Sequence, residues 1–366
     1  MRMGEASLDD PGWIAEIDAG GMLGLIAGLG AQLRHGFQAG MAASPSEEGS
    51  GPAASGPFGP DEVGAIVVSG MGGSGVAGDV LRAAFAGELR CPILVNKGYT
   101  LPRFCDDRTL LFAVSFSGNT EETLSAYAEA TARGCRVVAV SRGGRLADMA
   151  SADGVPHVSI PGDVPLPRAA IGYLSGALVG FLEGAGMLDA GAQAVSASRL
   201  VDRLALRWGP GRSIKENEAK AMAGWLAGRI PVIWGTEGVA EAAALRWKTE
   251  LNENAKVPAF HAVLPELDHN EVEGWSPGSG EAFGVVVLRH PGEHPRTPAR
   301  VAASIAALSA SGLAVREAGG EGASPLEWLF SLIVLGDFVS AYLAILRGVD
   351  PSPIPVLTAL KERLGR

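Results

Sequence analysis

Three hydroxyl side chains, Ser115, Ser117 and Thr120, stand in a short turn between two different kinds of element. The apolar run 110–114 before them is typical of a buried strand, and Glu121 after them opens an acidic helix start. Backbone N–H groups at such a helix start bind anions, and hydroxyls add uncharged donors that suit phosphate oxygens. The alternative is that Ser117, Asn119 or Thr120 merely caps the helix.

A glycine-rich loop comes before this turn along the chain. It follows the apolar run 65–69 and includes Gly72, Gly73 and Ser74. Glycine lets the backbone approach a ligand closely. No lysine follows the glycines, which excludes a Walker loop, and their spacing departs from the dinucleotide-binding fingerprint. If the two apolar runs are neighbouring parallel strands, the two loops face each other across the crevice of a doubly wound sheet.

Two charged residues are candidates for chemistry. Glu253 lies in the sequence RWKTELNENAK (246–256), near the end of a predicted helix, where a carboxylate could move a proton. Arg168 stands at the start of an apolar helix, where a cation opposes the helix dipole. For Glu253 the alternative is a solvated helix face, and for Arg168 it is ordinary surface charge.

His269 and Lys361 are further candidates. His269 lies in PELDHNEVEGW (265–275), and Glu266, His269 and Glu271 could be interpreted as metal ligands. No second histidine or cysteine stands at ligand spacing, so we expect no metal. Lys361 lies in a short amphipathic helix predicted over 355–364, where a cation favours the helix dipole even as a solvated group.

Four motifs carry a resemblance to a known family. The motifs GMGGSG (70–75) and SFSGNTEET (115–123) resemble the sugar isomerase (SIS) fold, whose members bind phosphosugars. NENAK (252–256) and ELDHNE (266–271) are similar to motifs of one branch, the bifunctional phosphoglucose/phosphomannose isomerases. The resemblance runs from about residue 61 to the C-terminus. Asp268 departs from it, because the family has asparagine there.

The resemblance implies a role for each candidate residue. Glu253 would be the base that moves a proton between C1 and C2 through a cis-enediolate. His269 and Lys361 would assist ring opening, and His269 would reach the site of the neighbouring subunit in a homodimer. Arg168 would stabilise the charged intermediate. The hexose 6-phosphate, mainly its phosphate, would be bound by Gly72, Gly73, Ser74, Ser115, Ser117 and Thr120.

These roles predict an enzyme, an aldose–ketose isomerase that interconverts glucose 6-phosphate and mannose 6-phosphate with fructose 6-phosphate and uses no cofactor. The alternative is a phosphosugar-binding regulator or subunit that is catalytically silent. Four chemically competent positions argue against that alternative, since a binding module has no need of them. A different aldose–ketose phosphate isomerase would share the phosphate loops but would not need both later motifs.

The composition excludes several classes of protein. The 366 residues carry a formal net charge of −10, which argues against a nucleic-acid-binding surface. The 3 cysteines form no even framework, and the first ten residues lack an apolar core, so we expect a soluble cytoplasmic protein with reduced thiols. The apolar stretches 171–188 and 329–346 each contain an acid, which favours buried helices over membrane spans.

The elements that position these residues follow an alternating pattern. Strand runs at 65–69, 92–96, 110–114, 136–140 and 157–160 alternate with helical stretches, and a similar pattern returns at 230–317. We therefore predict an α/β fold with two SIS domains, each a doubly wound, mostly parallel sheet flanked by helices. The expected parts are a helical arm and Pro/Gly/Ser linker (1–60), the first SIS domain (61–191), a helical connector (192–212) and the second SIS domain (213–366). In the second domain, Glu237 stands where an anion would bind.

Overall fold

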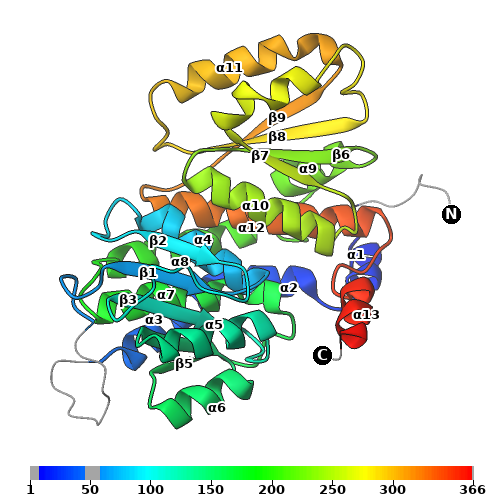
Figure 1. Ribbon diagram of the computed structural model, residues 1–366. Helices are drawn as coiled ribbons and strands as arrows, with labels where there is room; N and C mark the ends of the chain where they lie inside the picture. The colour runs from blue at the N-terminus through cyan, green and yellow to red at the C-terminus, as the bar shows by residue number, and fades with distance from the viewer. Residues whose placement is uncertain (1–7, 46–57, 365–366) are drawn as a thin grey trace. The chain divides into compact units, whose positions relative to one another are not determined.

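The computed structural model describes residues 8–45 and 58–364, and its chain forms two compact units (Figure 1). The first unit contains Gly28–Asp202 and Gly322–Leu329. The second contains the chain up to Ala27, Arg203–Glu321 and the chain from Phe330. The domain boundaries expected at residues 60, 191 and 212 remain predictions. Most of the predicted linker, 46–57, lies outside the described residues.

The sheet of the first unit is fully parallel, with strand order β2-β1-β3-β4-β5. Its strands agree with the predicted runs to within two residues at each end. Helices α4, α5 and α6 follow β1, β3 and β4, and each crossover helix returns the chain so that the next strand runs parallel. The elements are β1 (Ala65–Ser69), α4 (Gly73–Phe85), β2 (Ile93–Asn96), β3 (Thr109–Val114), α5 (Glu121–Ala132), β4 (Arg136–Ser141), α6 (Gly144–Asp153) and β5 (His157–Ser159).

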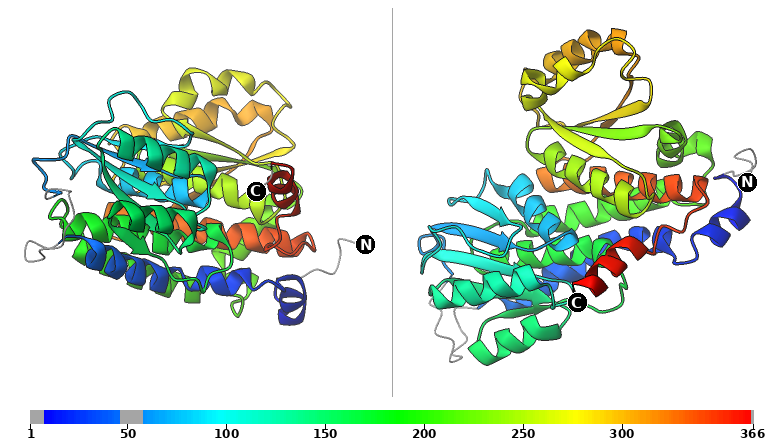
Figure 2. Two further views of the ribbon diagram at one scale, coloured as in Figure 1. Left: turned by 60° about the horizontal axis from the view of Figure 1, so that its bottom comes forward. Right: turned by 45° about the vertical axis from the view of Figure 1, so that its right-hand side comes forward.

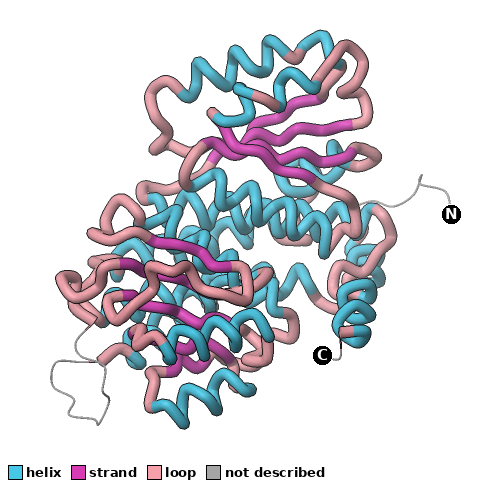
Figure 3. Tube along the Cα trace, in the orientation of Figure 1, coloured by secondary structure: helices cyan, strands magenta, loops and turns pink. Residues whose placement is uncertain are grey.

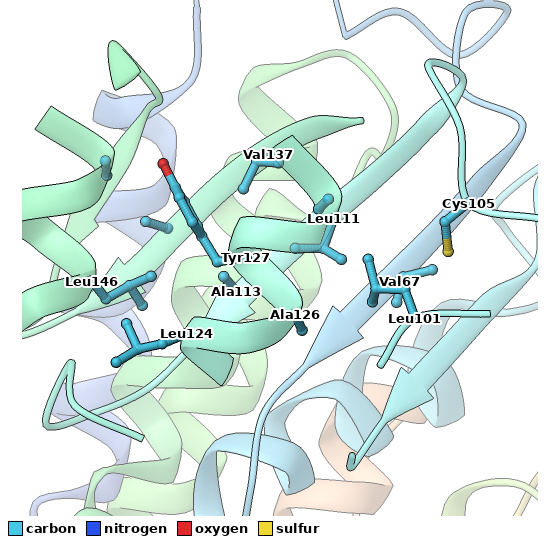
Figure 4. Close-up of a cluster of buried hydrophobic side chains, with 13 residues drawn as sticks. Val67, Leu101, Cys105, Leu111, Ala113, Leu124, Ala126, Tyr127, Val137 and Leu146 are labelled. Atoms are coloured by element: carbon cyan, nitrogen blue, oxygen red, sulfur yellow. The ribbon is translucent and has the colours of Figure 1, made fainter. Parts of the chain in front are cut away.

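Helices cover both faces of this sheet. On one face, Leu111 and Val137 meet Tyr127 of α5 and Leu146 of α6 in a buried cluster (Figure 4). On the other face, Phe112 of β3 packs edge-to-face on Phe181 of α7 (Ile171–Gly184), with 5.5 Å between ring centroids. Strands buried on both faces are continuously apolar, which is why 110–114 contains no polar alternation.

Glycines allow α3 (Leu29–Ala43) to pack closely along α7, as Figure 2 shows for the blue and green helices. A Cβ atom at Gly36 would collide with the carbonyl of Tyr173, and one at Gly176 would collide with the carbonyl of Leu33. The glycines that weaken the helical pattern in the sequence are therefore those that let the two backbones touch. The first unit also holds the 3₁₀ helix η1 (Pro167–Ala170).

The second unit has a smaller parallel sheet of order β7-β6-β8-β9, so that each unit of the tube in Figure 3 contains one layer of strands. The α/β class with two parallel sheets is confirmed. Strand β7 is not predicted from the sequence, because it is an edge strand whose first two residues are exposed and whose apolar pattern is short. The elements are α9 (Glu218–Leu226), β6 (Ile230–Thr236), α10 (Val239–Glu253), β7 (Phe260–Leu264), β8 (Phe283–Arg289), α11 (Thr297–Ala307) and β9 (Ala314–Gly319).

The remaining helices include the longest one, α12 (Pro325–Leu346). It is long and apolar enough to cross a membrane, but 94% of its most apolar window is buried inside the protein, as in the core helix predicted from the sequence. The other elements are α1 (Pro11–Ile17), α2 (Met22–Ala27), α8 (Gly191–Trp208), α13 (Pro355–Arg363) and the 3₁₀ helices η2 (Ile214–Glu216), η3 (Glu266–His269), η4 (Glu271–Gly274) and η5 (Ser309–Ser311).

Candidate active site

The strand order of the first unit reverses between β1 and β3. These strands are neighbours, β2 lies beyond β1, and β4 lies beyond β3. The loops at their carboxyl ends therefore border the crevice where open α/β sheets bind ligands. These are the glycine-rich loop after Ser69 and the hydroxyl-rich loop after Val114. The pairing of β1 with β3 confirms the prediction that the two loops lie next to each other.

The glycine-rich loop turns sharply into α4. Gly72 has φ +53°, a left-handed conformation that favours glycine, and the helix begins at Gly73. Ser74, in the first turn, is buried, and its Oγ accepts a hydrogen bond from the backbone N–H of Phe116 at 3.2 Å. Ser74 therefore ties one loop to the other and sets their spacing.

The hydroxyl-rich loop is held by its own side chains. The Oγ of Ser115, which is fully buried, lies 2.8 Å from Oγ1 of Thr120 and accepts from the N–H of Gly118 at 3.1 Å. The Oγ of Ser117 accepts from the N–H of Asn119 at 3.2 Å. Thr120 is the N-cap residue of α5 but makes no side-chain capping bond. The first turn of α5 therefore has no hydroxyl cap from Thr120, in contrast to the capping alternative.

Arg168 lies against the glycine-rich loop within the first unit. It belongs to η1, and only 3% of the residue is exposed. A Cβ atom at Gly73 would lie 3.2 Å from the Cα of Arg168 and 3.1 Å from the carbonyl oxygen of Pro167. Glycine at position 73 lets this segment come close, so Arg168 and the predicted phosphate loops are brought together by one close backbone contact.

A second cation lies beside the same loop and is not identified from the sequence. Lys97 follows β2 at the carboxyl edge of the sheet, and its Nζ lies 2.6 Å from Oδ2 of Asp79 on α4. A Cβ atom at Gly75 would lie 3.2 Å from the Cε of Lys97. The only available signal is that Lys97 comes directly after a strand run, since no motif surrounds it.

In the second unit, Glu253 is the last residue of α10 and is half-buried. The preceding turn of this helix is anchored by charge. Nη1 of Arg246 lies 2.7 Å from Oε1 of Glu250, and its Nε and Nη2 donate to the two carboxylate oxygens of Asp337 at 3.1 and 3.0 Å. These three side chains are 2–5% exposed. Although burial disfavours the charged guanidinium, its acidic neighbours raise the pKa of Arg246, so it remains a cation.

The residues after Glu253 stop the helix and hold its end. The amide nitrogen of Asn254 donates to Oε2 of Glu250 at 3.1 Å and to Oγ of Ser340 at 3.0 Å. Lys256 has φ +54°, and its Nζ donates to the carbonyls of Glu253 at 2.6 Å and Pro351 at 2.9 Å. The NENAK segment is thus held by hydrogen bonds directly after Glu253.

His269 is exposed at the end of η3, and its neighbour Asp268 anchors that turn. Asp268 accepts a hydrogen bond from Nη1 of Arg300 at 3.1 Å and one from Oγ of Ser304 at 2.6 Å, both on α11. The residue that departs from the family motif therefore has a structural partner. Lys361 is exposed in α13, so Glu253, His269 and Lys361 are contributed by three separate elements of the second unit.

The acidic residues near His269 have other partners. Oε1 of Glu271 accepts from Nε1 of Trp234 at 3.0 Å, and Oε1 of Glu266 accepts from the side-chain amide of Asn270 at 3.0 Å. Within 8–45 and 58–364, no group of three His, Cys, Asp or Glu side chains is arranged to hold a metal ion. The metal interpretation of Glu266, His269 and Glu271 is therefore not supported by their geometry.

Models of known protein families match the segments that form both sheets. A model of the SIS domain matches residues 62–152, and a model described as the bacterial phospho-glucose isomerase C-terminal SIS domain matches residues 215–364. In solved structures, a glucose-6-phosphate isomerase like protein from Thermus thermophilus aligns with a TM-score of 0.60 and 20% identity, over 98% of this chain and 100% of that one. At that identity the likeness supports the fold alone.

Two sequence relatives match over most of their length. A protein from Caldicellulosiruptor bescii, named bifunctional phosphoglucose/phosphomannose isomerase, is 35% identical over 83% of this chain and 91% of its own. A protein of the same name from Aquifex aeolicus is 35% identical over 82% of this chain and 90% of its own. The matched regions include both loops at the β1–β3 crevice and the segment that carries Glu253 and His269. This chain therefore belongs to the family of bifunctional phosphoglucose/phosphomannose isomerases.

Proposed function

We propose that this protein is an aldose–ketose isomerase that interconverts glucose 6-phosphate and mannose 6-phosphate with fructose 6-phosphate. The observation that carries the proposal is the match, at 35% identity over 83% of the chain, to a relative named for both activities. The two loops at the β1–β3 crevice support it independently, since their geometry suits a phosphate group.

The phosphate group is assigned to the first unit. The ligand would be held by Gly72, Gly73, Ser74, Ser115, Ser117 and Thr120. The support is the direct bond from Phe116 N–H to Ser74 Oγ, which keeps the two loops at a set spacing, and the start of α5, which Thr120 leaves without a side-chain cap. Backbone amides and hydroxyls there would donate hydrogen bonds to the phosphate oxygens.

The proton transfer is assigned to Glu253. Isomerisation moves a proton between C1 and C2 through a cis-enediolate, and one carboxylate can remove the proton from one carbon and return it to the other. The support is the location of Glu253 at a helix end that Asn254 and Lys256 hold in place. His269 and Lys361 would assist ring opening, and Arg168 would offset the charge of the enediolate.

The active form is proposed to be a cytoplasmic homodimer in which His269 reaches the neighbouring subunit's site. The support is that His269 is exposed at the end of η3, while Asp268 beside it is held by Arg300 and Ser304. An exposed imidazole on an anchored turn is accessible to a second chain. Size-exclusion chromatography with light scattering tests the dimer. A mixture of His269→Ala and Glu253→Gln chains tests the sharing, since mixed dimers would regain one complete site.

The activity is tested by formation of fructose 6-phosphate from glucose 6-phosphate and, separately, from mannose 6-phosphate, with EDTA present. Wild-type protein should convert both aldoses, and Glu253→Gln should lose about 10²–10⁴-fold in kcat, the typical contribution of a general base. The control is Glu237→Gln, an exposed carboxylate just before the other end of the same helix, which should keep wild-type rates.

Each other outcome changes the assignment in a defined way. If wild type shows no turnover while fructose 6-phosphate still raises its thermal midpoint, the protein is a phosphosugar-binding regulator. Turnover of one aldose keeps the mechanism and removes the dual specificity. If Glu253→Gln remains as active as Glu237→Gln, Glu253 is not the base.

A further inference from the structure

The sheet of the second unit has its own reversal of strand order. β6 and β8 are neighbours, with β7 beyond β6 and β9 beyond β8. The chain leaves β6 through α10 and leaves β8 through α11, so it turns away in opposite directions from the crevice at their carboxyl ends. In open α/β sheets this crevice binds ligands. The acid expected there from the sequence is Glu237.

The acid that the crevice contains is Glu293, whereas the side chain of Glu237 is exposed. Oγ1 of Thr236, at the end of β6, donates to Oε1 of Glu293 at 2.8 Å. Arg289, at the end of β8, donates to Oε1 through Nε at 2.8 Å and to Oε2 through Nη2 at 2.6 Å. The N–H of His290 donates to Oε1 at 3.2 Å. From the sequence we expect an acid at this crevice and assign it to Glu237. The acid that the donors hold is instead Glu293.

The surroundings of Glu293 favour a negative charge, since its carboxylate is buried among hydrogen-bond donors. Its side chain is 7% exposed, and Thr236 is fully buried. Burial by itself would raise the pKa of Glu293, but the hydrogen bonds from Arg289 and Thr236 outweigh it and lower that pKa below its ordinary value. A forked guanidinium, a hydroxyl and a backbone amide are also the donors that proteins use to bind phosphate.

The loops at the corresponding crevice of the first unit contain no acid. Residues 70–74 and 115–120 include glycines, hydroxyls and the side-chain amide of Asn119. We propose that Glu293 is a built-in substitute for a phosphate group, which closes a second anion site formed by Thr236, Arg289 and the His290 amide. Of the two sheets in residues 8–45 and 58–364, only that of the first unit would then bind phosphate at its switch point. The proposal for Glu293 does not depend on the proposed function. Only the identity of the sugar phosphate at the first unit's crevice rests on it.

The test uses full-length protein and inorganic phosphate. In Glu293→Ala the carboxylate is removed and its three donors remain. The control is Glu317→Ala, because Glu317 is the other carboxylate on Arg289, at 2.7 Å from Nη1, and its side chain is 50% exposed. Equilibrium dialysis at ionic strength balanced with chloride should give one more phosphate per chain for Glu293→Ala than for wild type or Glu317→Ala. Phosphate should also raise the thermal midpoint of Glu293→Ala by several degrees more than that of the other two.

An equal phosphate count in all three proteins overturns the proposal. If Glu293→Ala does not fold in chloride, the proposal requires phosphate or formate to restore folding, and failure of both anions overturns it. The measurement needs no isomerase activity. An inactive wild type combined with an extra phosphate in the variant would reject the proposed function alone. An active wild type without the extra phosphate would reject the second anion site alone.

Discussion

Asp337→Asn is expected to destabilise the second unit strongly, because it removes one charge from a buried network. Asp337 receives two hydrogen bonds from Arg246, at 3.1 and 3.0 Å, and both side chains are at most 5% exposed. Asparagine keeps the shape and one acceptor, but its NH₂ group would face a guanidinium N–H that has lost its partner. Glu250, paired with Arg246 at 2.7 Å, and the more weakly interacting Glu253 would then be left to offset the buried cation from the same helix.

The magnitude follows from the geometry. One charge-assisted hydrogen bond contributes about 1.5–3 kcal/mol, and removing one partner of a buried ion pair costs about 3–5 kcal/mol. We therefore expect Asp337→Asn to lower the free energy of unfolding by about 3 kcal/mol. That is a large share of the roughly 5–15 kcal/mol that stabilises a typical protein. Glu317→Gln, which breaks a pair of 2.7 Å with one carboxylate 50% exposed, should cost less than about 1 kcal/mol.

Urea unfolding followed by tryptophan fluorescence measures the difference. Trp247 reports on this region, since it is fully buried on α10 and its Nε1 donates to the carbonyl of Leu332 at 2.7 Å. The Asp337→Asn transition should move to lower urea with an unchanged slope. A loss within about 1 kcal/mol of that of Glu317→Gln would refute the reasoning, because the network would then behave like surface charge.

Three further outcomes are expected. Gly176→Ala should lower the free energy of unfolding by about 1–3 kcal/mol, because its Cβ would collide with the α3 backbone. Gly224→Ala in α9, where a Cβ would meet open space, should raise it by up to about 1 kcal/mol. Thermal melts compare the two variants. Ser74→Ala leaves the buried N–H of Phe116 without its acceptor and should raise the KM for the phosphosugar about tenfold in steady-state kinetics. Burial and a hydrogen bond to Asp163 raise the pKa of Tyr173 from 10.0 to about 12, so its contribution to stability is complete below pH 10 and is lost as pH rises through 12.

For each of these three predictions, a contrary result would show which step of the reasoning fails. Equal melting temperatures for the two glycine variants would mean that α3 and α7 can move apart freely. An unchanged KM for Ser74→Ala would separate loop spacing from phosphate binding. For Tyr173, the comparison is Tyr173→Phe, whose stability should fall less than that of wild type between pH 10 and 12; parallel curves would contradict the linkage.

Much of the first unit could be predicted from local sequence. Apolar runs such as 110–114, bounded by glycine and hydroxyl residues, predict strand, loop and helix in order, because burial on both faces demands continuous hydrophobicity and a helix start favours Glu121. The motif residues Glu253 and His269 were recognisable because their neighbours are close in the chain. These signals depend on periodicity and spacing within one element.

Contacts between distant segments could be decided only by the tertiary structure. Glu293 reaches Thr236, 57 positions away, and Asp268 reaches Ser304, 36 positions away, and neither pair belongs to a recurring pattern. Strand β7 is defined by pairing with β6 more than by its own apolar residues. The sequence by itself therefore determined the parallel α/β class and the loops that can hold phosphate. Tertiary structure decided which crevice is open to an anion, because a buried carboxylate is stable only where folding brings its donors together.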